Sequence, residues 1–172
     1  MNYLEAISLT KTLPCLADPD KIIVFGKPDH SLAEVIPFLA TLPGVISYNP
    51  ESLTLTFRRQ TGFITLFTDK IYITQVEDNE EVLELFNTLT DAINITWEHR
   101  AELVAVTAAR LAPRPLDVWT LLPQSNCKLC GEATCMAFAF GLLQQKHELE
   151  ECLPLQVDAA FSHRRSVLEA LL

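Results

Sequence analysis

Four cysteines near the C-terminal end are the residues of this chain best suited to metal chemistry. Cys127, Cys130 and Cys135 lie in one short segment, and Cys152 follows at some distance. A cubane iron–sulfur cluster needs four thiolates that converge from different directions, and one compact loop can supply three of them. The separate Cys152 would then close the site from the far side. The pattern predicts that these four cysteines hold one cluster.

The residues next to the cysteines have types that suit such a site. Thr134 is a predicted helix N-cap, which puts Cys135 in the first turn, where free N–H groups and the helix dipole favour a thiolate. Gly131 is expected to let the backbone turn closely around an inorganic core, where a Cβ atom would crowd it. Apolar side chains of the following helix are expected to keep water from the metal: Phe138, Phe140 and Leu142.

Composition limits the class of protein. The chain has 172 residues, 49% hydrophobic and 20% charged, which favours a folded core over disorder. Its net charge of −9 argues against nucleic acid as a partner, because phosphate binding needs clustered Lys and Arg. No run approaches the roughly 18 apolar residues of a membrane span, and Met1–Thr12 lacks the apolar core of a secretory signal. We therefore expect a cytoplasmic protein whose thiols stay reduced.

Two prolines indicate a domain boundary. Pro113 and Pro115 cannot continue a helix and favour an extended connection. The sequence thus predicts an α+β domain of unknown role over residues 1–112, rich in antiparallel strands. Residues 113–172 are expected to form a small, mostly helical four-cysteine iron–sulfur domain.

Apolar periodicity predicts the elements of both domains. Short apolar or alternating runs that end at turn residues indicate strands, and apolar residues at helical spacing indicate helices. A helix of some four turns is expected to lead from Cys135 towards Cys152. The expected strands are 21–26, 45–48, 53–58, 63–68 and 71–76. The other expected helices are 32–42, 79–92, 96–110 and 159–172.

The motifs around the cysteines follow the order of a known pattern. They are Leu122-Pro123, Asn126-Cys127, Cys130-Gly131, Thr134-Cys135, Met136-Ala137-Phe138-Ala139 and, in the tail, Lys146, Glu148-Leu149-Glu150 and Cys152. This segment, about residues 120–156, resembles the four-cysteine [4Fe–4S] domain of the corrinoid iron–sulfur protein large subunit. Similar domains occur in the B subunits of Rnf-type electron-transport complexes. The chain departs from the pattern at Leu153, where proline is usual, and at Lys128-Leu129.

The resemblance implies a cofactor and a kind of partner. It implies that Cys127, Cys130, Cys135 and Cys152 bind a single [4Fe–4S] cluster, which passes single electrons. The recipient would be a protein redox partner, such as a corrinoid protein or another metalloenzyme. Residues 1–112 resemble no family that we recognise.

Other interpretations of these residues stay open. Four thiols can also form a structural zinc site, although zinc usually takes two Cys-x2-Cys pairs and the chain has one, or they can be ordinary buried thiols. Cys15 is expected to be a small buried apolar residue. His147 can hydrogen-bond near the metal, but we expect it on a solvated helix face.

The expected function follows from the cysteines and from the lack of catalytic motifs. The sequence contains no G-x-G-x-x-G, P-loop, H-E-x-x-H or G-x-S-x-G motif, so we expect no catalytic residues and no enzymatic activity of the chain on its own. The leading hypothesis is an oxygen-sensitive, one-electron transfer or reductive-activation module whose first domain recognises the partner. The alternatives are an iron–sulfur redox or oxygen sensor or adaptor, and an interaction protein with structural zinc.

Overall fold

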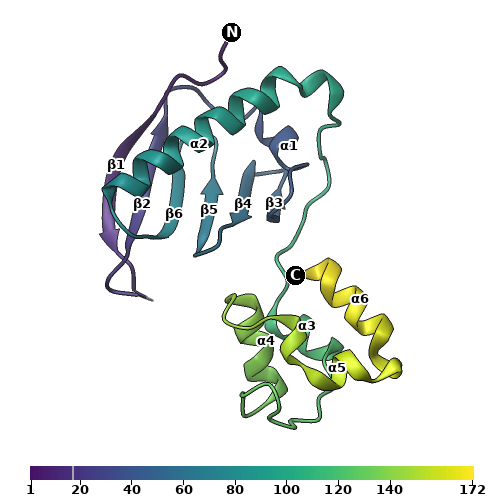
Figure 1. Cartoon of the computed structure of the whole chain (residues 1–172). Helices are drawn as coiled ribbons and strands as arrows, with labels where there is room; N and C mark the ends of the chain where they lie inside the picture. Colours follow the sequence, from purple (N-terminus) through teal and green to yellow (C-terminus); the bar gives the residue numbers. More distant parts are fainter. Residues whose placement is uncertain (17) are drawn as a thin grey trace. The chain divides into compact units, whose positions relative to one another are not determined.

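The chain forms two compact units, Met1–Leu111 (unit 1) and Ala112–Leu172 (unit 2), shown in Figure 1. The computed structural model describes residues 1–16 and 18–172. Unit 1 combines an antiparallel sheet with helices, and unit 2 is helical, so the α+β prediction is confirmed. In the described part of the chain, no helix is long and apolar enough to cross a membrane.

Unit 1 is built on an antiparallel sheet with the strand order β1-β2-β6-β5-β4-β3. The five predicted strands are confirmed as β2 to β6. The strand β1 was not predicted: it pairs with β2 at the sheet edge and buries little except Ile7, so its sequence shows no core-facing pattern. The strands are β1 (Ile7–Pro14), β2 (Ile22–Pro28), β3 (Val45–Asn49), β4 (Thr54–Arg58), β5 (Phe63–Leu66) and β6 (Ile71–Val76).

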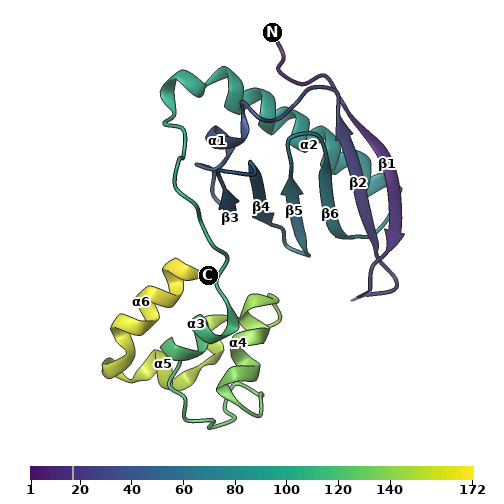
Figure 2. The same cartoon turned by 180° about the vertical axis from the view of Figure 1, so that it is seen from behind.

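Helices α1 (Ile36–Leu39) and α2 (Asn79–Glu98) pack on one face of this sheet. Figure 1 shows α2 crossing in front of the strands, and Figure 2 shows the sheet from its other face. The helix lies very close to β2, because a Cβ atom built on Gly26 would be 2.8 Å from Phe86 Cζ and 2.9 Å from Ile7 Cγ2. Glycine at this position therefore sets the distance between helix and sheet.

Two helix predictions in unit 1 are wrong in extent. The predicted helix 32–42 shortens to α1, which has Pro37 in its first turn, a position where the missing N–H costs nothing. The predicted helix 96–110 does not form. Instead α2 continues to Glu98, a short 3-10 turn (η1, Arg100–Glu102) follows, and Arg110 pairs with Tyr48 of β3 through N–H···O bonds of 2.8 and 2.9 Å. This pairing satisfies backbone groups that a helix would otherwise have to satisfy.

Unit 2 consists of short helices around a small apolar core. Its core contains the side chains of Val118, Leu122, Phe138, Leu142, Leu155 and Leu168, with Cys152 among them. The predicted final helix is present, although it starts later than expected. The elements are α3 (Pro115–Leu121), α4 (Cys135–Leu143), a 3-10 turn η2 (Leu149–Glu151), α5 (Leu153–Val157), a 3-10 turn η3 (Ala159–Phe161) and α6 (Ser162–Leu171).

Candidate metal centre

The loop that carries Cys127 and Cys130 turns tightly between them. Lys128 (φ 63°) and Gly131 (φ 88°) both have left-handed backbone conformations, and the Gly131 N–H donates to the Lys128 carbonyl oxygen at 3.1 Å. A Cβ atom at Gly131 would meet no protein atom within 4 Å. The positive φ of Gly131 is a backbone reason for glycine at this position, and the expected closeness of this backbone to an inorganic core stays a prediction.

The start of α4 is fixed by two side chains. Thr134 is the N-cap, as predicted, and its hydroxyl oxygen accepts a hydrogen bond from the Ala137 N–H at 3.1 Å. Asn126 Oδ1 accepts a second bond from the Cys135 N–H at 2.8 Å. This second contact ties the beginning of the cysteine loop to its end. Sequence reasoning missed it, because nothing local pairs an asparagine with an N–H nine positions later.

The return of the chain to Cys152 differs from the prediction. Helix α4 ends at Leu143 and does not run for four turns. Gln145 takes a left-handed conformation (φ 59°), and the Lys146 N–H donates to the Gly141 carbonyl oxygen at 2.9 Å, the pattern of a Schellman C-cap. The chain then reverses through η2, which places Cys152 in the core of unit 2, with 7% of its surface exposed.

All four predicted ligands line one small hollow. Cys127, Cys130, Cys135 and Cys152 surround it together with Leu122 and Phe138. Cys127 is exposed, Cys130 and Cys135 are partly exposed, and Cys152 is buried. The structure therefore brings together thiols from the loop, from the first turn of α4 and from the residue after η2.

The remaining cysteine and the predicted apolar wall have mixed outcomes. Cys15 is buried in unit 1, as expected of a small apolar side chain. Phe138 is 1% exposed and lines the hollow, and Leu142 is buried in the same core. The prediction for Phe140 is wrong, because this side chain is 48% exposed. Residues two apart on a helix point to nearly opposite sides, so Phe138 and Phe140 do not share a face.

The thiols at the two ends of the site differ in acidity. The pKa of Cys127 is lowered, mainly by a hydrogen bond from the Leu129 N–H and also by one from the Ser125 side chain. Burial raises the pKa of Cys152, and negative charge on the other three cysteines raises it further. Deprotonating all four would gather four negative charges around one hollow. This is favourable only when metal cations compensate them.

The donor set is suited to iron and sulfide. In the described part of the chain, no three His, Cys, Asp or Glu side chains are close enough together to bind a single metal ion. A cluster of several iron and sulfide ions is larger than one ion, and its thiolate ligands lie farther apart. The site offers four thiols around one hollow, a buried aromatic side chain, and the N-terminus of a helix. Thiolate ligands, hydrogen-bond donors and a dry wall are the features that hold and tune an iron–sulfur cluster.

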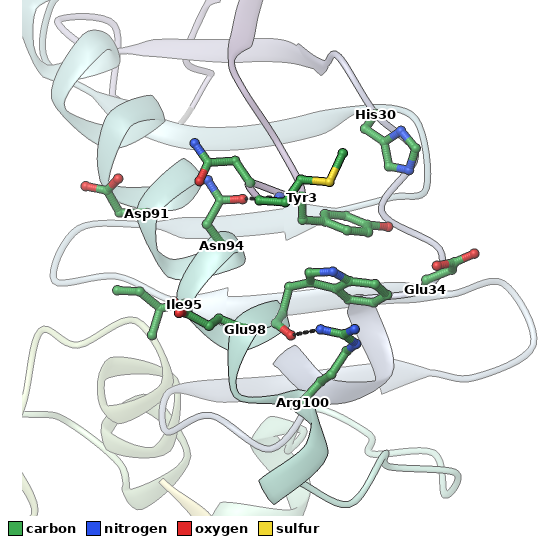
Figure 3. Close-up of a pocket in the computed structure, with 11 residues that line it drawn as sticks. Tyr3, His30, Glu34, Asp91, Asn94, Ile95, Glu98 and Arg100 are labelled. Carbon is green, nitrogen blue, oxygen red and sulfur yellow. Dashed lines mark hydrogen bonds between the residues drawn. The ribbon is translucent and has the colours of Figure 1, made fainter.

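A second hollow lies in unit 1, where the N-terminal segment meets α2 (Figure 3). Asn94 Oδ1 accepts hydrogen bonds from the N–H groups of Tyr3 (2.9 Å) and Leu4 (2.8 Å). The Tyr3 and Trp97 rings lie 4.4 Å apart, and the Arg100 guanidinium lies 4.1 Å from the Trp97 ring centroid. These polar and aromatic groups bind one another, and they fasten the N-terminal segment to the end of α2.

Comparison with protein families supports an iron–sulfur site. Residues 122–154 match a family model described as "Putative Fe-S cluster". This stretch contains all four cysteines of the hollow. No solved structure matches the chain.

Curated relatives are subunits of one kind of complex. The chain is 45% identical over 58 residues to acetyl-CoA decarbonylase/synthase complex subunit gamma 2 of Methanosarcina thermophila. The aligned stretch covers 34% of this chain and 12% of that subunit. It is 43% identical over 58 residues to subunit gamma of Methanosarcina acetivorans, with the same coverage. It is also 44% identical over 57 residues to subunit gamma of Methanothermobacter thermautotrophicus, covering 33% of this chain and 11% of the subunit. The chain thus spans only about an eighth of the length of these relatives.

These matches confirm the broader part of the predicted resemblance. They relate the cysteine segment to an iron–sulfur family, and about a third of the chain to part of a subunit of a multi-protein complex. They do not single out the corrinoid iron–sulfur protein large subunit or the Rnf-type B subunits. They also do not specify the type of cluster.

Proposed function

We propose that unit 2 binds a single [4Fe–4S] cluster through Cys127, Cys130, Cys135 and Cys152, and that the protein is a one-electron transfer or reductive-activation module for a partner protein. The observation that carries the proposal is the shared hollow. Four thiols from three parts of the chain line it, and a cluster of this type requires four thiolates. The family match over residues 122–154 supports the same cofactor.

The exposure of the ligands suits exchange of electrons with another protein. Cys152 is buried in the core, whereas Cys127 is exposed, so a bound cluster would be closest to solvent at the Cys127 side. Lys128 and Leu129, which follow Cys127, are also exposed, and Leu129 has 61% of its surface accessible. Protein interfaces combine an apolar core with a polar rim, so the exposed Leu129 beside the cysteines is a candidate contact for a partner. A corrinoid protein or another metalloenzyme is the proposed partner.

The roles of the chain's own residues follow from their positions. When bound, a cluster of this type supplies a group that accepts and releases one electron at a time. The four cysteines would hold it as thiolates, Phe138 would exclude water, and Thr134 and Asn126 would fix the helix start that carries Cys135. The partner protein would supply any chemistry on a substrate.

Anaerobic reconstitution tests the proposal. The full chain is incubated with iron and sulfide under reducing conditions, and metal, sulfide and EPR of the dithionite-reduced protein are measured. We expect the iron and sulfide content of one [4Fe–4S] cluster per chain, and a visible absorption band that bleaches reversibly on reduction. Serine replacement of Cys127, Cys130, Cys135 or Cys152 should lower the cluster content strongly. The matched control is Cys15→Ser, which makes the same change at a buried cysteine of unit 1 and should leave it unchanged.

Two results would contradict the proposal. A protein that takes up zinc but no iron or sulfide would be a structural zinc protein. Equal cluster content in Cys152→Ser and Cys15→Ser would show that the buried fourth cysteine is not a ligand. Neither result would contradict the description of the fold, because both concern only what the hollow binds.

A further inference from the structure

His147 lies between two carboxylates that belong to different parts of the candidate metal centre. Its Nε2 atom is 2.8 Å from Glu132 Oε1, and its Nδ1 atom is 2.5 Å from Glu151 Oε2. Both ring nitrogens thus face carboxylate oxygens, an arrangement in which a protonated imidazole donates two hydrogen bonds. Glu132 and then Glu151 raise the pKa of His147 above its ordinary value, which is consistent with the protonated form.

The imidazole ring of His147 also packs against α4. A Cβ atom built on Gly141 would lie 2.2 Å from His147 Cδ2, so glycine at this position leaves the space that the ring occupies. On the same helix, the Phe138 ring centroid is 5.3 Å from that of His147. The His147 side chain is 18% exposed and does not lie on a helix. The expectation that it projects from a solvated helix face is therefore wrong.

These contacts join the segments that carry the four cysteines. Glu132 belongs to the loop between Cys130 and Cys135, and Glu151 directly precedes Cys152. Gly141 and Phe138 belong to α4, which begins at Cys135. One side chain therefore connects the three-cysteine loop, the helix and the segment of the fourth cysteine.

We propose that His147 is a positioning residue of the metal centre: by bridging Glu132 and Glu151 on the surface of Gly141, it holds Cys152 against the loop that supplies the other three cysteines. This inference rests on the proposed cluster binding and adds to it the element that keeps the four ligands together. Residues that orient metal ligands through hydrogen bonds are typically worth about 10- to 100-fold in metal affinity. The sequence alone placed no carboxylate beside this histidine.

The test compares cluster loss in variants of the full chain. Wild type, His147→Ala, Gly141→Ala, Glu132→Gln and Glu151→Gln are reconstituted anaerobically, and the rate at which an excess of iron chelator bleaches the cluster is measured. We expect wild type to load fully and His147→Ala to lose its cluster about 10- to 100-fold faster. Gly141→Ala should reproduce this effect, since the added methyl group occupies the space of the His147 ring. The matched control is Glu150→Gln, the same change at the exposed carboxylate next to Glu151, which should behave as wild type.

A double variant distinguishes a bridge from independent contacts. If Glu132 acts only through His147, then His147→Ala combined with Glu132→Gln should lose the cluster no faster than His147→Ala alone. We also expect a lower midpoint potential in His147→Ala, because the variant removes a positive charge near a group that accepts an electron. A residue that only stabilised the fold would leave the potential unchanged.

The outcomes separate this inference from the proposed function. If wild type takes up no iron and sulfide, the proposed function itself fails. If wild type loads but His147→Ala and Gly141→Ala bleach at the wild-type rate, only the assignment of His147 is overturned. Faster bleaching with an unchanged potential would also overturn it, because His147 would then act on the stability of unit 2 in general.

Discussion

Replacement of Phe138 by alanine should unfold unit 2, whereas the same replacement at Phe140 should be tolerated. Phe138 is 1% exposed and packs in the core of unit 2, while Phe140, on the same helix, is 48% exposed. Removing a fully buried phenylalanine side chain costs about 3–5 kcal/mol. A substitution at a half-exposed surface position costs about 1 kcal/mol or less.

The size of unit 2 decides how serious the larger loss is. Unit 2 spans Ala112–Leu172, about 60 residues, and proteins gain roughly 0.05–0.15 kcal/mol of stability per residue. Its total free energy of unfolding is therefore about 3–9 kcal/mol. The loss at Phe138 is comparable to this total, and the loss at Phe140 is a small part of it.

Hydrogen exchange followed by mass spectrometry can read both units in one sample. In the anaerobically purified Phe138→Ala variant, amides of α3 and α4 should exchange at least a hundredfold faster, since each 1.4 kcal/mol corresponds to about tenfold. Peptides from unit 1 should be unchanged and serve as the internal reference. In Phe140→Ala, the exchange of α4 should rise by about fivefold at most. Equal losses of protection at the two positions would refute the assignment of Phe138 to the core.

Three further predictions follow from individual contacts. Gly26→Ala should lower the free energy of unfolding of unit 1 by about 1–3 kcal/mol, because the new methyl group collides with Phe86; urea denaturation measures this, and an unchanged midpoint would contradict the close helix–sheet packing. Gly131→Ala should lower the free energy of unfolding of unit 2 by about 1 kcal/mol because Gly131 has a positive φ, whereas Lys128→Gly, also at a positive φ, should not lower it. Thermal melts measure both changes, and the opposite order would contradict the left-handed backbone conformations of this loop. Two carboxylates raise the pKa of His147, so its contribution to the stability of cluster-free unit 2 should be fully present below the ordinary pKa of 6.5 and decline as the pH rises through the raised pKa. Thermal melts of wild type and His147→Gln should therefore converge with rising pH. A difference between the two that stays constant with pH would exclude this linkage.

Local sequence signals predicted a large part of the fold. The strands β2 to β6 follow from apolar or alternating runs that end at turn residues, because such a run has one strongly preferred way to bury its apolar side chains. The start of α4 follows from Thr134, whose hydroxyl can satisfy an N–H of the first turn wherever that helix packs. These features depend on residues that are close together in the sequence.

Features that depend on distant partners were missed or wrong. Strand β1 exists because β2 offers it an edge, and residues 103–110 are not helical because Arg110 pairs with Tyr48. The contacts of Asn126 and His147 join residues that are 9 and 15 positions apart, so they depend on how the loop lies against the rest of unit 2. In each case the free energy comes from a partner that the local sequence does not display.

The sequence by itself therefore determined which side chains are available for metal chemistry: four thiols, three of them in one loop. Only the tertiary structure decided that Cys152 returns to that loop, that Phe138 and not Phe140 lines the hollow, and that His147 bridges the segments around it. The physical reason is the range of the forces involved. Residue type and spacing fix what a side chain can bind, whereas packing of α4 against the returning chain fixes which side chains meet.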